Sequence, residues 1–279
     1  MSCKNKAGRG RNRGLTNKFP NPGREYSVFR VEKLFLRFTQ LMAYTHSTDH
    51  QTCQSCANRF NSVFCKAKEE YVNLINEQKV CNIYKKGQTL FNEGSNPFGV
   101  FCINDGKVKL SHQGDDGKEQ ITRLLKQGDV LGYRALLSGE RYSASAVALE
   151  DTQICFIPKE LFISVLKRDA GLAFEMMKLL SDELHKAELK ITHLAQKPIR
   201  ERLAETLLFI KETYGFEEDG ITLNVRLSRE EIANLVGTAT ESAIRLLSDF
   251  KKDGMVELDG KKIKILKHKE LVRTANLQD

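Results

Sequence analysis

The sequence lacks any apolar stretch that would serve as a membrane span or as a secretory signal. A transmembrane helix needs about 20 consecutive, mostly apolar residues, and a signal peptide needs a continuous apolar core near its start. Charged residues interrupt the early apolar stretch four times, at Arg30, Glu32, Lys33 and Arg37. We therefore predict a cytoplasmic protein without a membrane partner.

The sequence also lacks a net charge outside its first 41 residues. The whole chain of 279 residues carries a formal charge of +8. The first 41 residues contain ten Lys or Arg and two Asp or Glu, which leaves 34 residues of each sign in the rest. We predict a disordered basic leader at 1–41, within which 27–41 would suit a short amphipathic helix on an anionic surface. The alternative is a wrongly assigned start, with Met42 as the first residue.

Catalytic signatures are missing as well. We find no Ser/His/Asp set, no metallohydrolase motif and no phosphate-binding loop, which argues against an enzyme. The chain has seven cysteines, an odd number, and no secretory signal precedes them. Reduced thiols in a cytoplasm are therefore expected, and they point to metal binding or plain burial rather than to disulfides.

Glycines divide residues 80–157 into short apolar runs. They lie at Gly87, Gly94, Gly106, Gly114, Gly117, Gly128 and Gly139. The runs between them, such as GVFCIN and ICFIP, have the length and composition of β-strands. Short strands at this spacing predict a small antiparallel barrel or roll, followed by a short helix over 159–168.

Residues 170–194 carry a heptad pattern. Apolar residues recur there at alternating spacings of three and four, at Ala170, Ala173, Met177, Leu180, Leu184, Ala187, Ile191 and Leu194. Such a seam predicts a long helix that pairs with an identical helix in a homodimer. The alternative is packing on the chain's own core through the other apolar residues, which are Phe174, Met176, Leu179 and Leu189. Pro198 should end this helix and start another that runs towards Tyr214.

Residues 228–266 have the pattern of a winged helix-turn-helix. Ser228-Arg-Glu-Glu231 forms a capping box for a first helix, which Gly237 ends. Thr238-Ala-Thr-Glu241 forms a second capping box, for a helix that runs to about Lys252. Asp259-Gly260 then suits a type I′ turn between strands at 256–258 and 261–266.

The second of these helices is predicted to have an inward and an outward face. The inward residues are Ala243, Leu246, Leu247 and Phe250, and the outward residues are Thr240, Glu241, Ile244, Arg245 and Ser248. Arg245 would read guanine and Glu241 cytosine in a major groove, although the same two residues could be a surface ion pair. Residues 245–273 hold nine Lys or Arg against five Asp or Glu, which favours phosphate contacts.

Two cysteines stand at a spacing that is typical of metal sites. Cys53 and Cys56 are separated by two residues, and two such thiolates can reach one metal centre. His46 and His50 would complete a zinc site, and an unmetallated remnant is the other alternative. Cys155 lies in a predicted strand, where burial in the core is a sufficient explanation. We expect Cys81 and Cys102 to be buried strand thiols, while Cys3 belongs to the leader.

The order of roll, seam helix, proline joint and winged helix resembles the family of the catabolite activator protein and the fumarate–nitrate reduction regulator (CRP/FNR). The resemblance covers about residues 53–270. The sequence segments that carry it most specifically are KKGQTLFNEG, GKVKL, GKEQITRLLKQGDVLG, RLAETLL and REEIANLVGTATESAIRLLSDFKKDGMV. Glu241 and Arg245 fall at the family's usual base-reading positions, while Thr240 and Ile244 fall at positions that vary within it.

This resemblance implies an α+β protein with an N-terminal antiparallel β-roll of the cyclic-nucleotide-binding type, a long dimerisation helix and a C-terminal winged helix-turn-helix. The family binds palindromic promoter sites as homodimers and works with RNA polymerase. We divide the chain accordingly into the leader at 1–41, a cysteine segment plus sensor roll at 42–168, a dimerisation helix at 169–197 and a DNA-binding domain at 198–279.

The signal is the open part of this prediction. Members that bind cyclic AMP carry a Glu and an Arg-Ser pair in the roll, where this chain has Tyr133 and Tyr142-Ser143. Arg134 and Arg141 lie nearby. Without the carboxylate for the ribose, cyclic AMP is not expected. The alternative function is that of a regulatory subunit that binds a ligand of the cyclic-nucleotide type.

The oxygen-sensing branch of the family implies a different ligand. Its members hold a [4Fe–4S] cluster with three N-terminal cysteines and one in a late strand. The corresponding residues here are Cys53, Cys56, Cys65 and Cys155. Eight residues separate Cys56 from Cys65, against five in the best-known members. The prediction is a dimeric, sequence-specific DNA-binding regulator that responds to a redox, gas or small-molecule signal, with a structural zinc site as the alternative.

Overall fold

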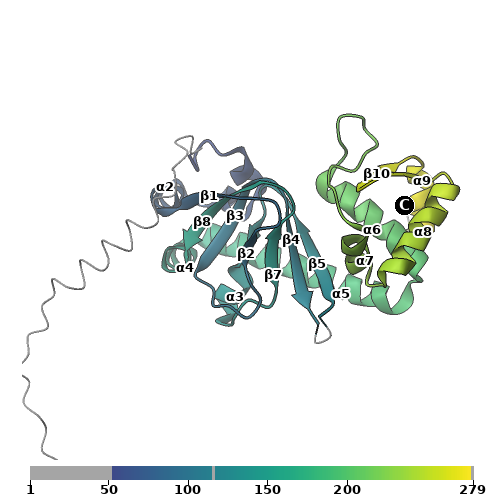
Figure 1. Ribbon diagram of the computed structural model, residues 1–279. Coiled ribbons are helices and arrows are strands. Elements are labelled where there is room, and N and C mark those ends of the chain that lie inside the picture. The colour runs from purple at the N-terminus through teal and green to yellow at the C-terminus, as the bar shows by residue number, and fades with distance from the viewer. Residues whose placement is uncertain (1–51, 115–116, 278–279) are drawn as a thin grey trace, which may run out of the picture. The chain divides into compact units, whose positions relative to one another are not determined.

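The computed structural model describes residues 52–114 and 117–277 (Figure 1). The predicted leader at 1–41, its helix at 27–41, His46 and His50 lie outside the described residues. Within the described part, no helix is long and apolar enough to cross a membrane.

The predicted antiparallel roll is confirmed. Its strands are β1 (Val80–Tyr84), β2 (Thr89–Phe91), β3 (Gly99–Asp105), β4 (Val108–Gln113), β5 (Glu119–Leu125), β6 (Val130–Leu131), β7 (Ser145–Ala148) and β8 (Thr152–Pro158). They form two antiparallel sheets, in the orders β1-β8-β3-β6 and β2-β7-β4-β5. Gly106 makes the tight turn from β3 to β4 at a φ of 97°, and a Cβ there would lie 2.5 Å from Thr152 Oγ1. No other residue fits that turn without displacing β8.

Strand β3 contributes to two different cores because its side chains alternate between the two faces of the sheet. Phe101 and Ile103 belong to the core between the two sheets of the roll. Val100 is buried on the opposite face, in a second core against which Cys102 packs. Burial on both faces explains why the run GVFCI contains no charged residue.

The second core is formed by the segments that cover the outer face of the β1-β8-β3-β6 sheet. These are η2 (Val63–Lys66), α2 (Glu69–Gln78) and α4 (Lys159–Arg168), with the start of α5 (Ala170–Gln196). Their shared apolar residues include Phe64, Val72, Ile75, Phe162, Leu172 and Met176. The 3₁₀ segment η1 (Ala57–Asn61) precedes η2 and has no buried residue. The short helix α3 (Tyr133–Ser138) follows β6.

Helix α5 confirms the predicted long helix and leaves its seam uncovered in the single chain. Met177, Leu184 and Ile191 are 58%, 62% and 68% exposed, and Leu180, Ala187 and Leu194 are also exposed. Of the residues expected to pack inward, Met176 is buried and Leu179 packs against the second core. Phe174 and Leu189 are exposed instead, because α5 contacts its own domain mainly through its first turns.

The winged helix-turn-helix is also confirmed. Its elements are α6 (Ile199–Tyr214), α7 (Arg229–Val236), α8 (Thr240–Lys252), β9 (Val256–Asp259), β10 (Lys262–Ile265) and α9 (His268–Thr274). Pro198 is the N-cap of α6, and the capping box of Ser228 and Glu231 is present. Apolar side chains from α6, α7, α8 and both strands of the wing share one core.

Two local predictions in this region are wrong. Helix α8 has Ala239 as its N-cap and no capping side chain. The N–H of Thr238 instead donates to Ala233 O at 3.1 Å and closes the end of α7. The wing turn consists of Gly260 and Lys261, since Asp259 pairs with Lys262. With Gly260 first, at a φ of 54°, this arrangement fits a type II′ turn better than type I′.

Asp169 joins the N-terminal segment to the long helix. Its side chain is buried and accepts hydrogen bonds from Gly171 N at 2.9 Å, Leu172 N at 3.1 Å and Lys68 N at 2.7 Å. The first two bonds cap α5, and the third anchors the chain just before α2. One carboxylate thus satisfies three backbone donors on two elements.

Asp169→Ala should therefore lower the free energy of unfolding by about 2–4 kcal/mol, because it removes a helix cap and leaves buried N–H groups without acceptors. Urea unfolding of the purified variant measures this loss. Asp169→Asn is the matched control and should lose less, since asparagine caps helices about as well. Equal stability of wild type and Asp169→Ala would refute this role.

Candidate functional site

Helix α8 presents the outward face that the sequence predicted. Ala243, Leu247 and Phe250 are buried in the winged-helix core, and Leu246 packs against it. Glu241, Ile244 and Arg245 are exposed on the other side, whereas Thr240 and Ser248 are half-buried. Ser248 Oγ donates to Ile244 O at 2.9 Å, which fixes its hydroxyl on the helix.

Glu241 and Arg245, the predicted base-reading pair, are both exposed on α8. In the described part of the structure, neither Glu241 nor Arg245 belongs to an ion pair. The surface ion pair considered as an alternative is thus not formed here. Lys251 and Lys252 at the end of α8 and Lys261 at the tip of the wing are exposed on the same domain. Exposed lysines are side chains of the kind that contact phosphates in protein–DNA complexes.

Aromatic side chains occupy the positions at which cyclic-AMP binders hold charged groups. Tyr133 is fully buried. Tyr142 stacks on Phe91 with a centroid distance of 3.9 Å, and its hydroxyl donates to Gly99 O at 3.5 Å. Burial raises the pKa of Tyr142 to about 12, so this residue is a neutral part of the core at neutral pH. Neither tyrosine supplies the carboxylate or cation that a ribose phosphate needs.

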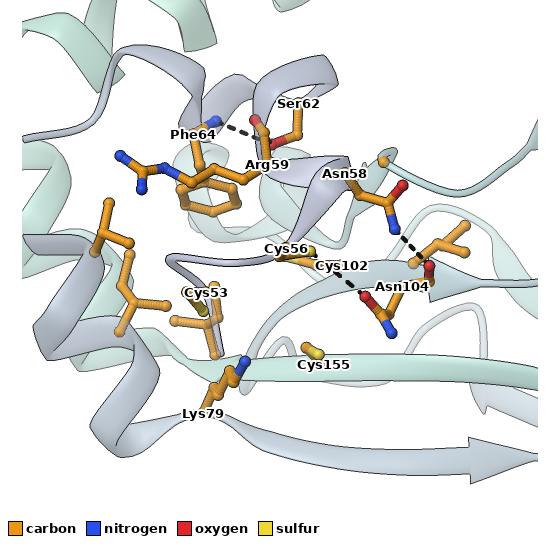
Figure 2. A pocket seen from close by; sticks show the side chains of 15 residues that line it. Cys53, Cys56, Asn58, Arg59, Ser62, Phe64, Lys79, Cys102, Asn104 and Cys155 are labelled. Atoms are coloured by element: carbon orange, nitrogen blue, oxygen red, sulfur yellow. Dashed lines mark hydrogen bonds between the residues drawn. The ribbon is translucent and has the colours of Figure 1, made fainter. Parts of the chain in front are cut away.

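A pocket with a volume of about 70 Å³ lies between the N-terminal segment and the β1-β8-β3-β6 sheet (Figure 2). Four cysteines line it: Cys53, Cys56, Cys102 and Cys155. Figure 2 shows Cys53 and Cys56 on the loop before η1, facing the strands that carry Cys102 and Cys155. The side chain of Lys79 enters the same space from the end of α2.

The strand cysteines form a row that follows from the pairing register. Cys155 on β8 is directly opposite Cys81 on β1 and Cys102 on β3. Directly opposite residues of an antiparallel ladder project to the same face, so the three thiols lie side by side. The Sγ atoms of Cys81 and Cys155 are 2.8 Å apart.

Amide side chains hold the loop of Cys53 and Cys56 against the sheet and α2. Cys53 N donates to Asn76 Oδ1 of α2 at 2.9 Å. Asn104 on β3 accepts from Asn58 Nδ2 through its backbone oxygen at 2.6 Å, and its Oδ1 lies 3.5 Å from Cys56 Sγ. These bonds fix both loop cysteines relative to β3 and α2.

The pKa values of three pocket cysteines, Cys53, Cys102 and Cys155, are raised. Burial raises the pKa of Cys53 and that of Cys102. The pKa of Cys155 is raised by its hydrogen bond to Cys81 and by burial. Burial tends to lower the pKa of Lys79, but its electrostatic interactions with Cys53 and Cys155 raise that pKa overall. A bound metal would have to displace thiol protons, which makes binding pH-dependent.

The structure brings together three of the four predicted cluster ligands. Cys53, Cys56 and Cys155 line the pocket, whereas Cys65 lies half-buried in η2 and does not. The role of all four stays a prediction. Cys102 was expected to be only a buried strand thiol. Its place in the pocket depends on strand pairing, which the spacing of cysteines along the chain does not reveal.

Four thiols line this pocket, and thiolates are ligands both of zinc and of iron–sulfur clusters. Within the described residues, no three His, Cys, Asp or Glu side chains are grouped closely enough to hold one ion. Tetrahedral zinc with bonds of about 2.3 Å requires sulfur atoms about 3.8 Å apart. A [4Fe–4S] cluster binds each thiolate through a different iron, so its ligands stand farther apart. Four thiols around one pocket supply the donors that such a cluster needs.

Comparison with known proteins agrees with the β-roll and with the winged helix-turn-helix. The cyclic nucleotide-binding domain family matches residues 82–169, and the Crp-like helix-turn-helix domain family matches residues 201–274. The anaerobic regulatory protein of Bacillus subtilis is 33% identical over 187 residues, covering 66% of this chain and 78% of that protein. The fumarate and nitrate reduction regulatory protein of Escherichia coli is 31% identical over 227 residues, covering 80% and 90%.

A solved structure shows the same fold. It is that of a transcriptional regulator of the crp/fnr family from Eubacterium rectale, with a TM-score of 0.64 and 22% sequence identity. The match covers 77% of this chain and 97% of that one.

Proposed function

Because the chain belongs to the CRP/FNR family of transcription regulators, we propose that it binds a palindromic promoter site as a homodimer and reports oxygen or redox state through its cysteine pocket. DNA binding rests on one observation above all. Helix α8 exposes Glu241, Ile244 and Arg245 while its other face is buried in the winged-helix core. A helix that is held rigidly from behind can present such side chains to base edges in a major groove.

The homodimer is supported by the uncovered seam of α5. Its apolar positions recur at heptad spacing and remain exposed in the single chain, Leu184 and Ile191 by more than 60%. A narrow apolar stripe of this kind is stabilised by an identical helix, which buries both stripes at once. Two DNA-reading helices related by the dimer axis would match a palindrome with half-sites about one helical turn apart.

Two observations support the proposed oxygen or redox signal: the cysteine pocket and the names of two relatives. Two relatives are named for anaerobic and for fumarate–nitrate regulation. A [4Fe–4S] cluster, when bound, would supply chemistry that oxygen attacks. Cys53, Cys56 and Cys155 would hold it together with a fourth thiol, for which the sequence offers Cys65. Lys79 would place a positive charge beside this anionic group, and its burial would strengthen that attraction.

The pocket is connected to the dimer helix through the second core. Phe64, Val72 and Ile75 line the pocket and pack in the same core as Leu172 and Met176 of α5. A ligand that favours one arrangement of the N-terminal segment would thereby favour one position of α5. The division into the four segments 1–41, 42–168, 169–197 and 198–279, the contact with RNA polymerase and the cytoplasmic location remain parts of this proposal.

A cyclic-nucleotide-type regulatory subunit is the second candidate function, and the aromatic packing around Tyr142 argues against it. A structural zinc site is the third. Its predicted ligands include His46 and His50, which lie outside the described residues.

The double substitution Leu180→Glu and Leu184→Glu should convert the dimer to a monomer, because each glutamate would bury an unpaired charge in the seam. Multi-angle light scattering measures the result. The matched control, Lys186→Glu with Leu189→Glu, adds two glutamates at exposed positions of α5 outside the seam and should remain dimeric. A dimeric seam variant would exclude α5 as the interface.

Arg245→Ala should cost about 1–3 kcal/mol of binding free energy and relax the preference for one G·C pair in each half-site. Selection from random duplex DNA, with protein kept anaerobic, should return a palindrome for the wild type and a site degenerate at that pair for the variant. Lys261→Ala is the control. Because it removes a phosphate contact, it should weaken binding to all sequences equally. The same uniform loss for Arg245→Ala would make that residue a phosphate contact.

A further inference from the structure

We propose that Lys109, a buried lysine on β4, is a positioning residue for DNA binding. It fixes the winged helix on the roll of the same chain and thereby sets the spacing at which a dimer reads its two half-sites. The inference rests on the proposed DNA-binding function. It adds a second connection between the roll and the DNA-reading helix α8, beside the one through the Pro198 joint.

Strand β5 carries the surface on which the winged helix lies. In the described part of the chain, β5 is the last strand of the sheet β2-β7-β4-β5. Two of its backbone carbonyls accept hydrogen bonds from helix side chains: Ile121 O from Lys190 Nζ of α5 at 3.1 Å, and Leu125 O from Tyr214 Oη of α6 at 3.2 Å. Helices commonly cover the edge strand of a sheet in this way. Strand β5 is thus bonded to α5 and to the winged helix at once.

Apolar contact accompanies these hydrogen bonds. Three residues of the roll, Ile121, Leu124 and Leu149, are buried in the core of the winged helix. That core also contains Leu207 of α6 and Leu235 of α7. Burial of apolar surface favours the contact but is non-directional, so it does not by itself select one position of α7.

Lys109 supplies the directional part of the contact. Its neighbours Val108 and Leu110 face the core of the roll, so Lys109 projects from the opposite face of β4. The side chain is 10% exposed, and its Nζ lies 3.1 Å from Glu119 of β5 and 3.1 Å from Glu231 of α7. A buried ammonium group is costly unless it is paired. A small shift of α7 would remove one of its two partners, so the ion pairs favour a single position.

Helix α7 is held from its first turn onward. Glu231 Oε2 accepts a hydrogen bond from Ser228 N at 2.8 Å within the capping box, while Oε1 of the same residue pairs with Lys109. Asn234, three residues further along the same helix, donates from Nδ2 to Glu119 Oε2 at 3.3 Å. Residues three apart lie on one face of a helix, so this face of α7 is tied to β4 and β5 together.

The contact leaves the reading face of α8 free, since Glu241, Ile244 and Arg245 are exposed. Docking on the roll therefore orients the DNA-reading helix without blocking it. In a dimer formed through α5, two winged helices held in this way would stand at one fixed separation, which sets the half-site spacing. Winged helices released from the roll would accept several spacings and bind each more weakly, because the second half-site contact would be less preorganised.

The test measures the binding of full-length protein to duplexes in which the spacer between the selected half-sites is varied by single base pairs. Wild type should prefer one spacer strongly. Lys109→Met should bind that spacer about tenfold more weakly and discriminate less against the others, with the half-site sequence unchanged. Lys126→Met is the matched control, because it removes an exposed lysine just after β5 and should bind as wild type does.

Glu231→Gln covers the case in which Lys109→Met folds poorly. Glutamine keeps the capping box and removes the charge that pairs with Lys109, so the spacing preference should relax in the same direction. Hydrogen exchange of the free protein gives a readout without DNA. The amides of α7 and β5 should exchange faster in both variants than in wild type, and Lys126→Met should leave them unchanged.

An unchanged spacing preference in both variants would overturn the inference and leave the DNA-binding function standing. Tighter DNA binding by either variant would make the contact inhibitory and would also overturn it. A wild type that selects no palindrome would instead overturn the proposed function, and the hydrogen exchange data would still show whether Lys109 holds α7 on the roll.

Discussion

The pairing of β3 with β8 is the constraint on which the sensor half of the molecule depends. The ladder places Cys102 beside Cys155 on one face of the sheet and Phe101 beside Phe156 on the opposite face. Because side chains alternate, the same strand supports the roll core on one side and the cysteine pocket on the other. A shift of the register by one residue would exchange these two environments and destroy both.

The second core connects this sheet to α4 and to the start of α5. It contains residues of the N-terminal segment, the sheet, α4 and the first turns of α5, so the pocket and α5 share one packed interior. Asp169 reinforces the connection by binding backbone N–H groups on both sides of it. Packed interiors of this kind have low compressibility and transmit strain. A shift of α5 would change the contacts of its exposed apolar seam with a partner subunit.

Much of this organisation could be predicted from residue patterns. The heptad spacing predicted α5, Pro198 predicted the joint, and Ser228 with Glu231 predicted the start of α7. Each of these signals is local, because it acts within one or two helical turns. Predictions failed where the outcome depended on contacts with other elements. The N–H of Thr238 donates to Ala233 O at the end of α7, so Thr238 does not cap α8. The pairing of Asp259 with Lys262 makes Gly260 and Lys261 the wing turn. The position of Cys102 in the pocket depends on two strands about 50 residues apart in sequence, which no local spacing encodes.

The most direct test of the central claim is whether the cysteine pocket controls DNA binding. Oxygen is titrated into anaerobic protein bound to a fluorescent duplex that carries the selected palindrome, and cluster absorption and DNA anisotropy are recorded on the same sample. We expect the affinity for DNA to fall in proportion to the lost absorption. Unchanged affinity after the absorption has disappeared would contradict coupling between the pocket and the DNA-reading helices.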